Sequence, residues 1–252
     1  MLHVTKPIAL SHNGYICMDA SLTHQRAPDM PATARRWDIS YGEAVAIQNE
    51  LRKRVDFSPL RRAIGAIAGA DVSFDKRNNT MYAAVAVLEF PSLDPLELAT
   101  VRGEAAFPYI PGLLSFREAP IVVEAFEKLA RKPDILICDG QGVAHPRGFG
   151  LASHLGIMLG IPTIGCAKSR LCGEHGEVGQ NVGDYTPLKL KGRTIGAVLR
   201  TRRGVKPVFV SAGNKCLLKD AIKITLDCAI KYRLPEPTRL AHHLVSRLRL
   251  KA

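Results

Sequence analysis

The hydrophobic and polar positions along this chain alternate between helical and strand-like spacing. Apolar residues recur at helical spacing from position 44 to position 55, and Ser40 and Glu43 just before them have the spacing of a capping box. We therefore expect a helix over about 41–55. Three strand-like runs follow it, and the turn residues between them predict two hairpins, at 75–80 and 91–95.

The order of the predicted elements indicates the fold class. Three consecutive strands precede a helix, and a strand, a helix and a strand follow, which is typical of a mixed α/β sheet covered by helices. The segment at 169–193 lacks periodicity, so we expect a long loop there. The predicted strands cover 67–74, 81–89, 97–104, 135–138, 163–167, 193–200 and 206–211. The other predicted helices cover about 115–130, 150–159 and 217–232.

Periodicity also sets the expected domain limits. Residues 1–38 are punctuated by glycine, proline and polar residues, so we expect an irregular arm there. A single domain is expected over 39–245, followed by a basic tail at 246–252. With 252 residues, the chain is long enough to bury one sizeable core.

The charge balance favours a polyanionic partner. The chain carries 35 Lys and Arg against 23 Asp and Glu, a formal net charge of +12, and clustered basic side chains gain affinity for phosphates by releasing counterions. The six cysteines are scattered without a CxxC pair, which indicates a reducing compartment, and we expect a cytoplasmic monomer. No apolar run reaches about 18 residues, so no membrane-spanning helix is expected.

The candidate chemistry begins at Asp139, which directly follows the predicted buried strand at 135–138. Ligands of open α/β sheets bind beyond the carboxyl ends of strands, and Gly140 and Gly142 let a ligand approach the backbone closely. The plainer alternative is that Asp139 and Gly140 only form a turn. The dipeptide alone does not decide between these interpretations.

Two further carboxylates stand at positions that call for an explanation. Asp71 lies within a strand-like run, where a buried carboxylate requires a cation, a metal or hydrogen bonds. Glu118 lies three residues after Ser115, so it either caps a helix or points toward a cation. The plainer alternative for Asp71 is a position at a strand end, facing water.

Taken together, the three carboxylates predict a site for a divalent ion. Hard oxygen ligands suit Mg²⁺ or Mn²⁺, and the sequence has no Cys/His cluster that would favour zinc. Such a site supports phosphodiester hydrolysis, because metal ions activate water and stabilise the leaving oxygen. Lys168 would offset charge on the phosphate. His145 would order or deprotonate the attacking water, or hold the phosphate.

A proline-flanked aromatic interrupts the order of strands at 107–112. Pro108 and Pro111 fix φ on either side of Tyr109 and Ile110, and Gly112 permits a sharp exit. We expect a stiff loop that presents an aromatic side chain. The alternative is a turn in which Tyr109 packs inward.

These features together resemble the endonuclease V family, whose members act at deaminated bases, above all inosine. Five segments carry the resemblance; they occur in the family order and span roughly residues 40–240. They are GADVSF at 69–74, PYIPGLLSFRE at 108–118, DGQGVAHPR at 139–147, PTIGCAKSRL at 162–171 and YRLPEPTR at 232–239.

The resemblance implies a ribonuclease H-like fold, in which a five-stranded mixed sheet is flanked by helices. It implies that Asp71, Glu118 and Asp139 bind Mg²⁺, with Mn²⁺ as a substitute. His145 and Lys168 would assist catalysis. The implied substrate is DNA containing deaminated bases, chiefly deoxyinosine. The second phosphodiester bond 3′ to the lesion would be hydrolysed, leaving 3′-hydroxyl and 5′-phosphate ends.

The resemblance also implies a lesion-recognition loop. Its aromatic side chain would insert where the damaged base leaves the stack, replacing part of the lost stacking. The wedge would consist of Pro108, Tyr109, Ile110, Pro111 and Gly112. The base pocket would consist of Gly112, Leu114, Gly140, Gly142 and Leu171, where missing side chains leave space and backbone groups read the base edge.

One segment departs from the family pattern. Residues 211–215 read Ser-Ala-Gly-Asn-Lys, where the family usually has His in the fourth position, and Lys219 stands at the family's acid position. Asn214 can contact water or phosphate, but it does not titrate near neutral pH. We therefore expect metal and lesion binding with a lower turnover than in a His-bearing relative.

Three alternatives stay open on the sequence. The first is a nuclease for inosine-containing RNA, since no residue identifies or excludes a contact to the 2′-hydroxyl. The second is an inosine-binding module with impaired catalysis, against which the three carboxylates argue. The third is another ribonuclease H-like nuclease, such as the incision half of an excision-repair protein, against which the 108–112 segment argues.

Overall fold

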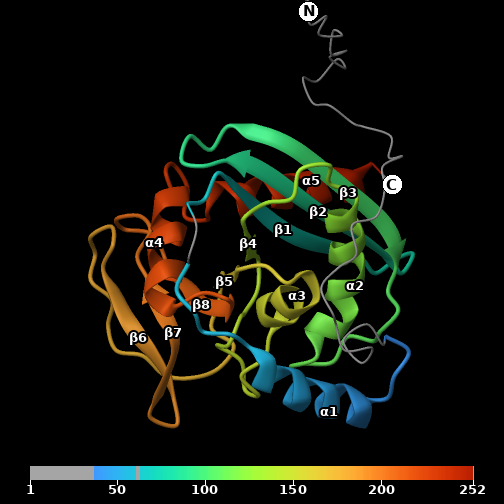
Figure 1. The fold of residues 1–252 in the computed structure, drawn as a ribbon, viewed down its shortest axis with the longest axis horizontal. Coiled ribbons are helices and arrows are strands. Elements are labelled where there is room, and N and C mark those ends of the chain that lie inside the picture. The colour runs from blue at the N-terminus through green and yellow to red at the C-terminus, as the bar shows by residue number, and fades with distance from the viewer. Residues whose placement is uncertain (1–36, 61–62, 252) are drawn as a thin grey trace, which may run out of the picture.

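The computed structural model describes residues 37–60 and 63–251. The predicted arm at 1–38 therefore lies outside the described residues, apart from its last two positions. One mixed sheet is covered by helices on both faces (Figure 1). This confirms the predicted α/β class.

The sheet has eight strands in the order β3-β2-β1-β4-β5-β8-β7-β6. Strand β4 is parallel to its neighbours β1 and β5, and the other adjacent pairs are antiparallel. The strands are β1 (Ala66–Asp75), β2 (Thr80–Glu89), β3 (Pro95–Glu104), β4 (Ile135–Cys138), β5 (Thr163–Ala167), β6 (Tyr185–Leu190), β7 (Arg193–Leu199) and β8 (Val208–Asn214). The expectation of five strands was wrong, because three further strands extend the sheet beyond β5.

Strand β6 lies within the segment that was expected to be a loop. Only Leu188 of its six residues is buried, so the strand lacks the apolar run that marks a central strand. Pro187 is tolerated because β6 is the outermost strand of the sheet and pairs only with β7. An edge strand of this kind leaves little signal in the sequence.

Alternating side chains of the central strands enter two separate cores. In β4, Leu136 and Cys138 pack into the core under the first three helices, whereas Ile135 and Ile137 face the last two. The first core lies under α1 (Tyr41–Leu51), α2 (Leu114–Glu127) and α3 (Leu151–Leu159), and the second under α4 (Leu218–Cys228) and α5 (Glu236–Leu250). A short 3₁₀ helix, η2 (Arg52–Arg54), follows α1.

Helix α5 changes the expected domain limit. It continues without a break across position 245, and Val245 itself is fully buried in the second core. The expected boundary between a domain ending at 245 and a basic tail at 246–252 therefore falls inside a helix.

Among the described residues, no helix combines the length and apolar character needed to cross a membrane.

The two predicted capping boxes had different outcomes. At α1, Ser40 accepts a hydrogen bond from the backbone of Glu43, and the Glu43 carboxylate accepts one from the backbone of Ser40, as predicted. At α2 the prediction was wrong, because Leu113 is the N-cap and the Ser115 hydroxyl contacts His154 instead. Glu118 therefore lies within α2, beyond its first turn, and is not a cap residue.

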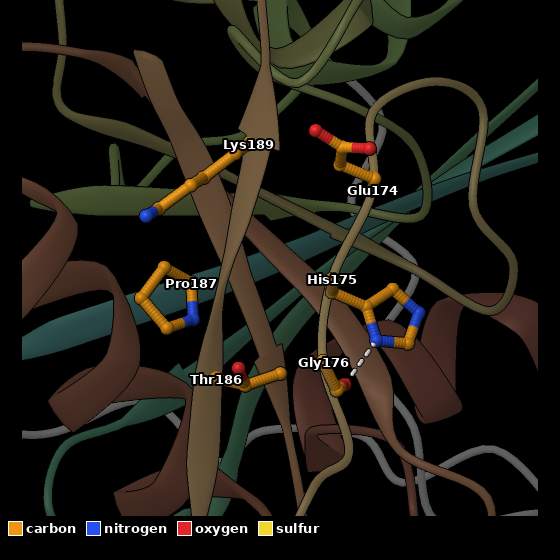
Figure 2. Close-up of a pocket in the computed structure, with 6 residues that line it drawn as sticks. All are labelled: Glu174, His175, Gly176, Thr186, Pro187 and Lys189. Carbon is orange, nitrogen blue, oxygen red and sulfur yellow. Dashed lines mark hydrogen bonds between the residues drawn. The ribbon is translucent and has the colours of Figure 1, made fainter. Parts of the chain in front are cut away.

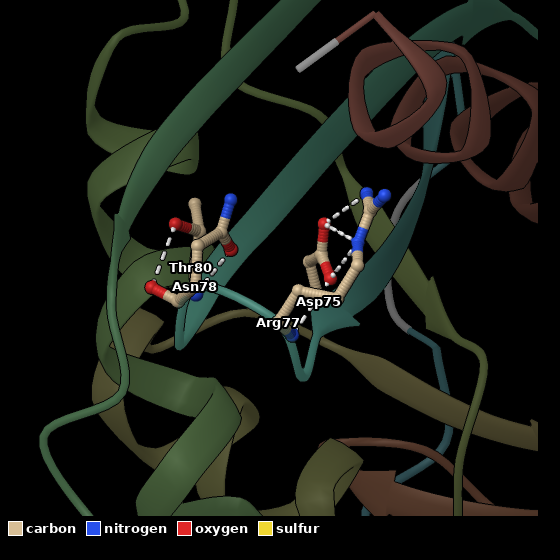
Figure 3. Close-up of polar contacts among 4 residues, drawn as sticks. All are labelled: Asp75, Arg77, Asn78 and Thr80. Atoms are coloured by element: carbon tan, nitrogen blue, oxygen red, sulfur yellow. Dashed lines mark hydrogen bonds and ion pairs between the residues drawn. The ribbon is translucent and has the colours of Figure 1, made fainter.

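The hairpin predicted at 75–80 is confirmed. Asp75 accepts hydrogen bonds from the backbone and guanidinium of Arg77, and the Asn78 side chain accepts one from the backbone of Thr80 (Figure 3). These local bonds close the turn between β1 and β2. They also occupy Asp75, the second aspartate of β1.

Candidate active site

Parallel pairing of β1 and β4 brings two of the predicted carboxylates together. Ala70 is in register with Cys138, so the next residues, Asp71 and Asp139, lie at the same level of the sheet. The backbone N–H of Asp139 donates to the carbonyl of Ala70 at 3.1 Å. The strand register therefore places the two carboxylates beside each other, although they are 68 residues apart in the chain.

His242 joins this pair from the opposite end of the chain. It lies on α5, and its Nδ1 is 2.7 Å from Oδ2 of Asp71. One ligand atom from each of Asp71, Asp139 and His242 can be chosen so that all three lie within 4.8 Å of one another. Three such groups at this spacing can hold a metal ion. His242 was not predicted as a site residue. The segment that contains it was not assigned to a helix, so nothing in the sequence placed it near Asp71.

A close backbone contact holds α5 in this position. A Cβ atom on Gly69 of β1 would lie 2.1 Å from the carbonyl carbon of Pro237, in the first turn of α5. Only glycine permits this approach. The GADVSF and YRLPEPTR segments are therefore packed against each other, and their contact places His242 beside Asp71.

Opposing electrostatic effects act on the Asp71 carboxylate. Burial raises the pKa of Asp71, and the negative charge of Asp139 raises it further, while the hydrogen bond from His242 and the charge of Lys168 act in the opposite direction. Lys168, the first residue after β5, forms an ion pair with Asp139. A pair of adjacent carboxylates that basic side chains only partly compensate fits the binding of a divalent cation.

Glu118 lies near the cluster without belonging to its tightest group. Burial raises the pKa of Glu118 to about 8, and the charges of Asp71 and Asp139 add to this effect. The predicted three carboxylates are thus electrostatically coupled. The atoms within 4.8 Å of one another, however, come from the two aspartates and His242.

His145 is placed differently from the prediction. It is only 4% exposed; its Nε2 lies 3.0 Å from the carbonyl oxygen of Gly112, and its Nδ1 accepts a hydrogen bond from the backbone of Arg147. Burial, followed by the charge of Arg147, lowers the pKa of His145 to about 4. A neutral ring with both nitrogens engaged by the backbone anchors a loop, and it has no free nitrogen with which to deprotonate water.

The loop at 107–112 presents its aromatic side chain to solvent, as expected. Tyr109 is 69% exposed, whereas Phe107 is buried. Arg117 fixes the start of the loop by donating to the carbonyl of Phe107 at 3.0 Å, and its guanidinium lies 4.1 Å from the ring centre of Phe74. The alternative in which Tyr109 packs inward is therefore wrong.

The residues predicted to form a base pocket divide into two groups. Leu114 and Leu171 are exposed, and Gly112 and Gly140 are partly exposed. Gly142 is buried, and a Cβ there would lie 2.0 Å from the carbonyl oxygen of Ala212 in β8. Its N–H also donates to the Ser211 hydroxyl. The absent side chain of Gly142 thus makes room for β8 and leaves no open space for a base.

Asn214 does not have the contacts that were expected of it. It is 3% exposed; its Nδ2 donates to the carbonyl of Gly156, and its Oδ1 accepts from the backbone of Asp56, both at 3.0 Å. These bonds give Asn214 a structural role in place of a water or phosphate contact. Lys219 is exposed in the first turn of α4, where the carboxylate of the next residue, Asp220, accepts from the Leu217 backbone. The lower turnover expected relative to a His-bearing relative stays a prediction, which cleavage by Asn214→His would test.

A surface hollow of about 350 Å³ lies between β6 and the segment before it (Figure 2). None of its lining residues was predicted to belong to the site. They are Glu174, His175, Gly176, Thr186, Pro187 and Lys189. His175 contacts the carbonyl of Gly176 within this wall, and most of the lining is exposed. None of the three residues of the carboxylate cluster, Asp71, Asp139 and His242, lines this hollow.

Comparison with known proteins gives consistent matches over most of the chain. Residues 49–243 match the family model described as Endonuclease V. A curated Endonuclease V from Trichormus variabilis is 51% identical over 211 residues, which cover 83% of this chain and 96% of the relative. The crystal structure of Endonuclease V from Streptomyces avermitilis is 43% identical, with a TM-score of 0.82 over 88% of this chain and 97% of that chain.

A third match includes nucleic acid. It is the crystal structure of Ciona intestinalis Endonuclease V in complex with a 24mer DNA containing an inosine followed by a ribo-adenosine. That protein is 28% identical to this chain, with a TM-score of 0.73, and the match covers 83% of this chain and 98% of the other. The similarity therefore extends to a structure solved on an inosine-containing strand.

Proposed function

Because this chain belongs to the endonuclease V family, we propose that it recognises deaminated bases in DNA, chiefly deoxyinosine. It hydrolyses the second phosphodiester bond on the 3′ side of the lesion, leaving 3′-hydroxyl and 5′-phosphate ends. The observation that carries the proposal is the meeting of Asp71 and Asp139 beside Lys168. A carboxylate pair beside a basic side chain suits metal-dependent phosphodiester hydrolysis.

The strand order supports a ribonuclease H-like core within the larger sheet. The five strands β3-β2-β1-β4-β5 are contiguous, mixed in direction and flanked by helices. In this proposal, β8, β7 and β6 form an extension of that core. Asp71 then lies on β1, and Asp139 directly follows β4, the strand next to it in this core.

The metal of this site is proposed to be Mg²⁺, with Mn²⁺ as a substitute. Asp71, Glu118 and Asp139 offer the hard oxygen atoms that these ions prefer. When bound, a divalent ion lowers the pKa of an attacking water and stabilises the leaving oxygen. His242 orients Asp71 through its hydrogen bond, as partners of metal-binding side chains commonly do.

The remaining residues of the proposal act on the substrate. The ammonium group of Lys168 offsets the charge of the phosphate that is attacked. The residues at 108–112 form the wedge, and the exposed ring of Tyr109 fills the gap left by the lesion base, which offsets part of the few kcal/mol that unstacking costs. His145 contributes by holding the end of this loop.

The cellular setting is also part of the proposal. We take the protein to act as a monomer in the cytoplasm. The five cysteines among the described residues are all free, which is consistent with a reducing compartment.

The proposal can be tested on matched strands. Inosine-containing and undamaged DNA, together with the corresponding RNA, would be incubated with the protein with and without Mg²⁺, and the cut mapped at nucleotide resolution. We expect Mg²⁺-dependent cleavage of the inosine DNA at the second bond 3′ to the lesion, and no cleavage by Asp139→Asn. Cleavage of inosine RNA alone would show an RNA nuclease, and metal-dependent binding without cleavage would show a reader.

A further inference from the structure

One carbonyl group at the end of the 107–112 loop receives three hydrogen-bond donors. The oxygen of Gly112 lies 3.0 Å from Nε2 of Gln48, 3.0 Å from Nε2 of His145 and 2.5 Å from a terminal nitrogen of Arg147. A carbonyl oxygen has two lone pairs, so three donors saturate it. Gly112 also has a φ of +79°, a conformation that side chains other than glycine rarely adopt.

Gln48 connects this carbonyl to the rest of the site. It lies on α1, is 1% exposed, and its Nε2 donates to the carbonyls of both Gly112 and Phe149 at 3.0 Å. Its Oε1 accepts from Nε of Arg147 at 2.5 Å. The amide thus uses both of its N–H groups and its oxygen. No alternative partner is needed to satisfy it.

The contacts of Gln48 join segments that are distant in the chain. Gly112 ends the recognition loop, while Arg147 and Phe149 belong to the segment that follows Asp139. Arg52, in the 3₁₀ helix after α1, adds a further bond to the carbonyl of Arg147 at 3.4 Å. The first helix thereby clamps the recognition loop to the segment that leaves the carboxylate site.

We propose that Gln48 is a positioning residue for lesion recognition, which holds the loop bearing Tyr109 at a fixed place relative to Asp139. This inference rests on the proposed function. Arg117 fixes the start of the loop through Phe107, and Gln48 fixes its end through Gly112. Between these anchors, two prolines restrict the backbone. The backbone that carries Tyr109 is therefore set in place before the substrate binds, which lowers the entropic cost of recognition.

The plainer interpretation is that Gln48 only satisfies buried carbonyls and stabilises the fold. Two substitutions of Gln48 separate the positioning role from the purely structural role. Gln48→Glu keeps the size of the side chain and an acceptor for Arg147, but its carboxylate has no N–H for Gly112 or Phe149. Gln48→Met removes the donors without adding a charge, and it serves if the glutamate variant does not fold.

The test measures the single-turnover rate at which an inosine strand is cleaved, at a series of rising enzyme concentrations. The resulting curve gives two separate quantities, the enzyme concentration at half-saturation and the maximal rate. For folded Gln48→Glu or Gln48→Met, we expect the half-saturating concentration to rise about tenfold, with a maximal rate within about threefold of the original. Direct Mn²⁺ binding without nucleic acid should not change. A purely structural role would lower the melting temperature and the active fraction while leaving half-saturation of the folded protein unchanged.

The matched control is Glu50→Gln on the same helix. Glu50 is exposed, and within the described part of the chain its carboxylate pairs with Lys53. The half-saturating concentration of this variant should therefore equal that of the original protein. A double-mutant cycle adds Tyr109→Ala. If Gln48 acts through the loop, Gln48→Glu should have less than about a twofold effect on half-saturation once Tyr109 is removed.

The outcomes distinguish this inference from the proposed function. A folded Gln48 variant with unchanged half-saturation, or effects that add fully with Tyr109→Ala, would overturn the positioning role. Failure of the unaltered protein to prefer inosine strands over undamaged strands would instead overturn the proposed function itself. Both are supported if the unaltered protein prefers inosine strands and if half-saturation on those strands rises in the Gln48 variants but not in Glu50→Gln.

Discussion

The imidazole of His242 meets the carboxylate of Asp71, although 171 residues separate them in the chain. Nδ1 of His242 is 2.7 Å from Oδ2 of Asp71, and the histidine side chain is 45% exposed. An imidazole that donates from Nδ1 fixes the carboxylate and leaves Nε2 free. Asp71 is thereby oriented by a helix that belongs to the opposite face of the sheet from α2.

This contact predicts a specific effect of His242→Ala. Loss of a group that orients a metal-binding carboxylate typically lowers metal affinity about 10–100-fold. We expect that loss in a titration of cleavage rate against Mg²⁺ concentration, with the rate partly restored at saturating Mg²⁺. His243→Ala is the matched control, because His243 is the exposed neighbour on the same helix. Equal effects of the two substitutions would contradict the role of His242.

The two aspartates of β1 should respond differently to the same substitution. Asp71→Asn removes a carboxylate from the proposed metal site, and we expect single-turnover cleavage to fall about a thousandfold or more. Asp75→Asn removes the charge that pairs with Arg77 in the hairpin and leaves the proposed metal site unchanged, so cleavage should stay close to that of the original protein. Cleavage assays on both variants, with circular dichroism to verify folding, check this contrast. Strong cleavage by Asp71→Asn would remove the metal role of that residue.

The sequence predicted those parts of the fold in which burial leaves a clear pattern. Strands β1, β2, β4 and β5 carry apolar runs because both of their faces are covered. Strand β6 has one buried residue, and α5 opens with two prolines near a basic, polar segment. Neither gives a strong periodic signal, so both were missed.

The same reasoning explains the outcome at the candidate site. Asp71 and Asp139 were predictable, because a carboxylate within or directly after an apolar strand is conspicuous. His242 was not, since its place depends on the packing of α5 against Gly69. Asn214 was misinterpreted because residue type does not reveal which way a side chain points. In the structure its amide is buried between two backbone segments.

The raised pKa of Glu118 predicts how the metal-free protein responds to pH. The pKa of Glu118 is about 8 in the folded protein, against 4.5 for an ordinary glutamate. Between these values the folded protein keeps a proton that the unfolded chain releases. The free energy of unfolding contributed by this group therefore falls as the pH rises through that window. Denaturant unfolding in the presence of a chelator, at several pH values, measures this slope.

A variant without the Glu118 carboxylate, and the addition of Mg²⁺, should each change this dependence on pH. Glu118→Gln cannot titrate, so its free energy of unfolding should depend less steeply on pH over the same window. Divalent ions bind the ionised carboxylates, so adding Mg²⁺ should stabilise the unaltered protein more at the alkaline end. A slope that is identical in the original protein and in Glu118→Gln would show that other groups cause it.

The close packing of α5 on β1 predicts a strong effect of Gly69→Ala. The new Cβ would lie 2.1 Å from the carbonyl carbon of Pro237, which is backbone and cannot rotate away. We expect a loss of about 1–3 kcal/mol or more in the free energy of unfolding, because α5 must move. Weaker Mg²⁺ binding, seen as a higher Mg²⁺ concentration for half-maximal cleavage, should accompany this loss, since α5 carries His242. Gly42→Ala in α1, where nothing lies within 4 Å of the new atom, should instead stabilise the protein by about 0.4–1 kcal/mol. Similar chemical denaturation curves for both variants would contradict the packing argument.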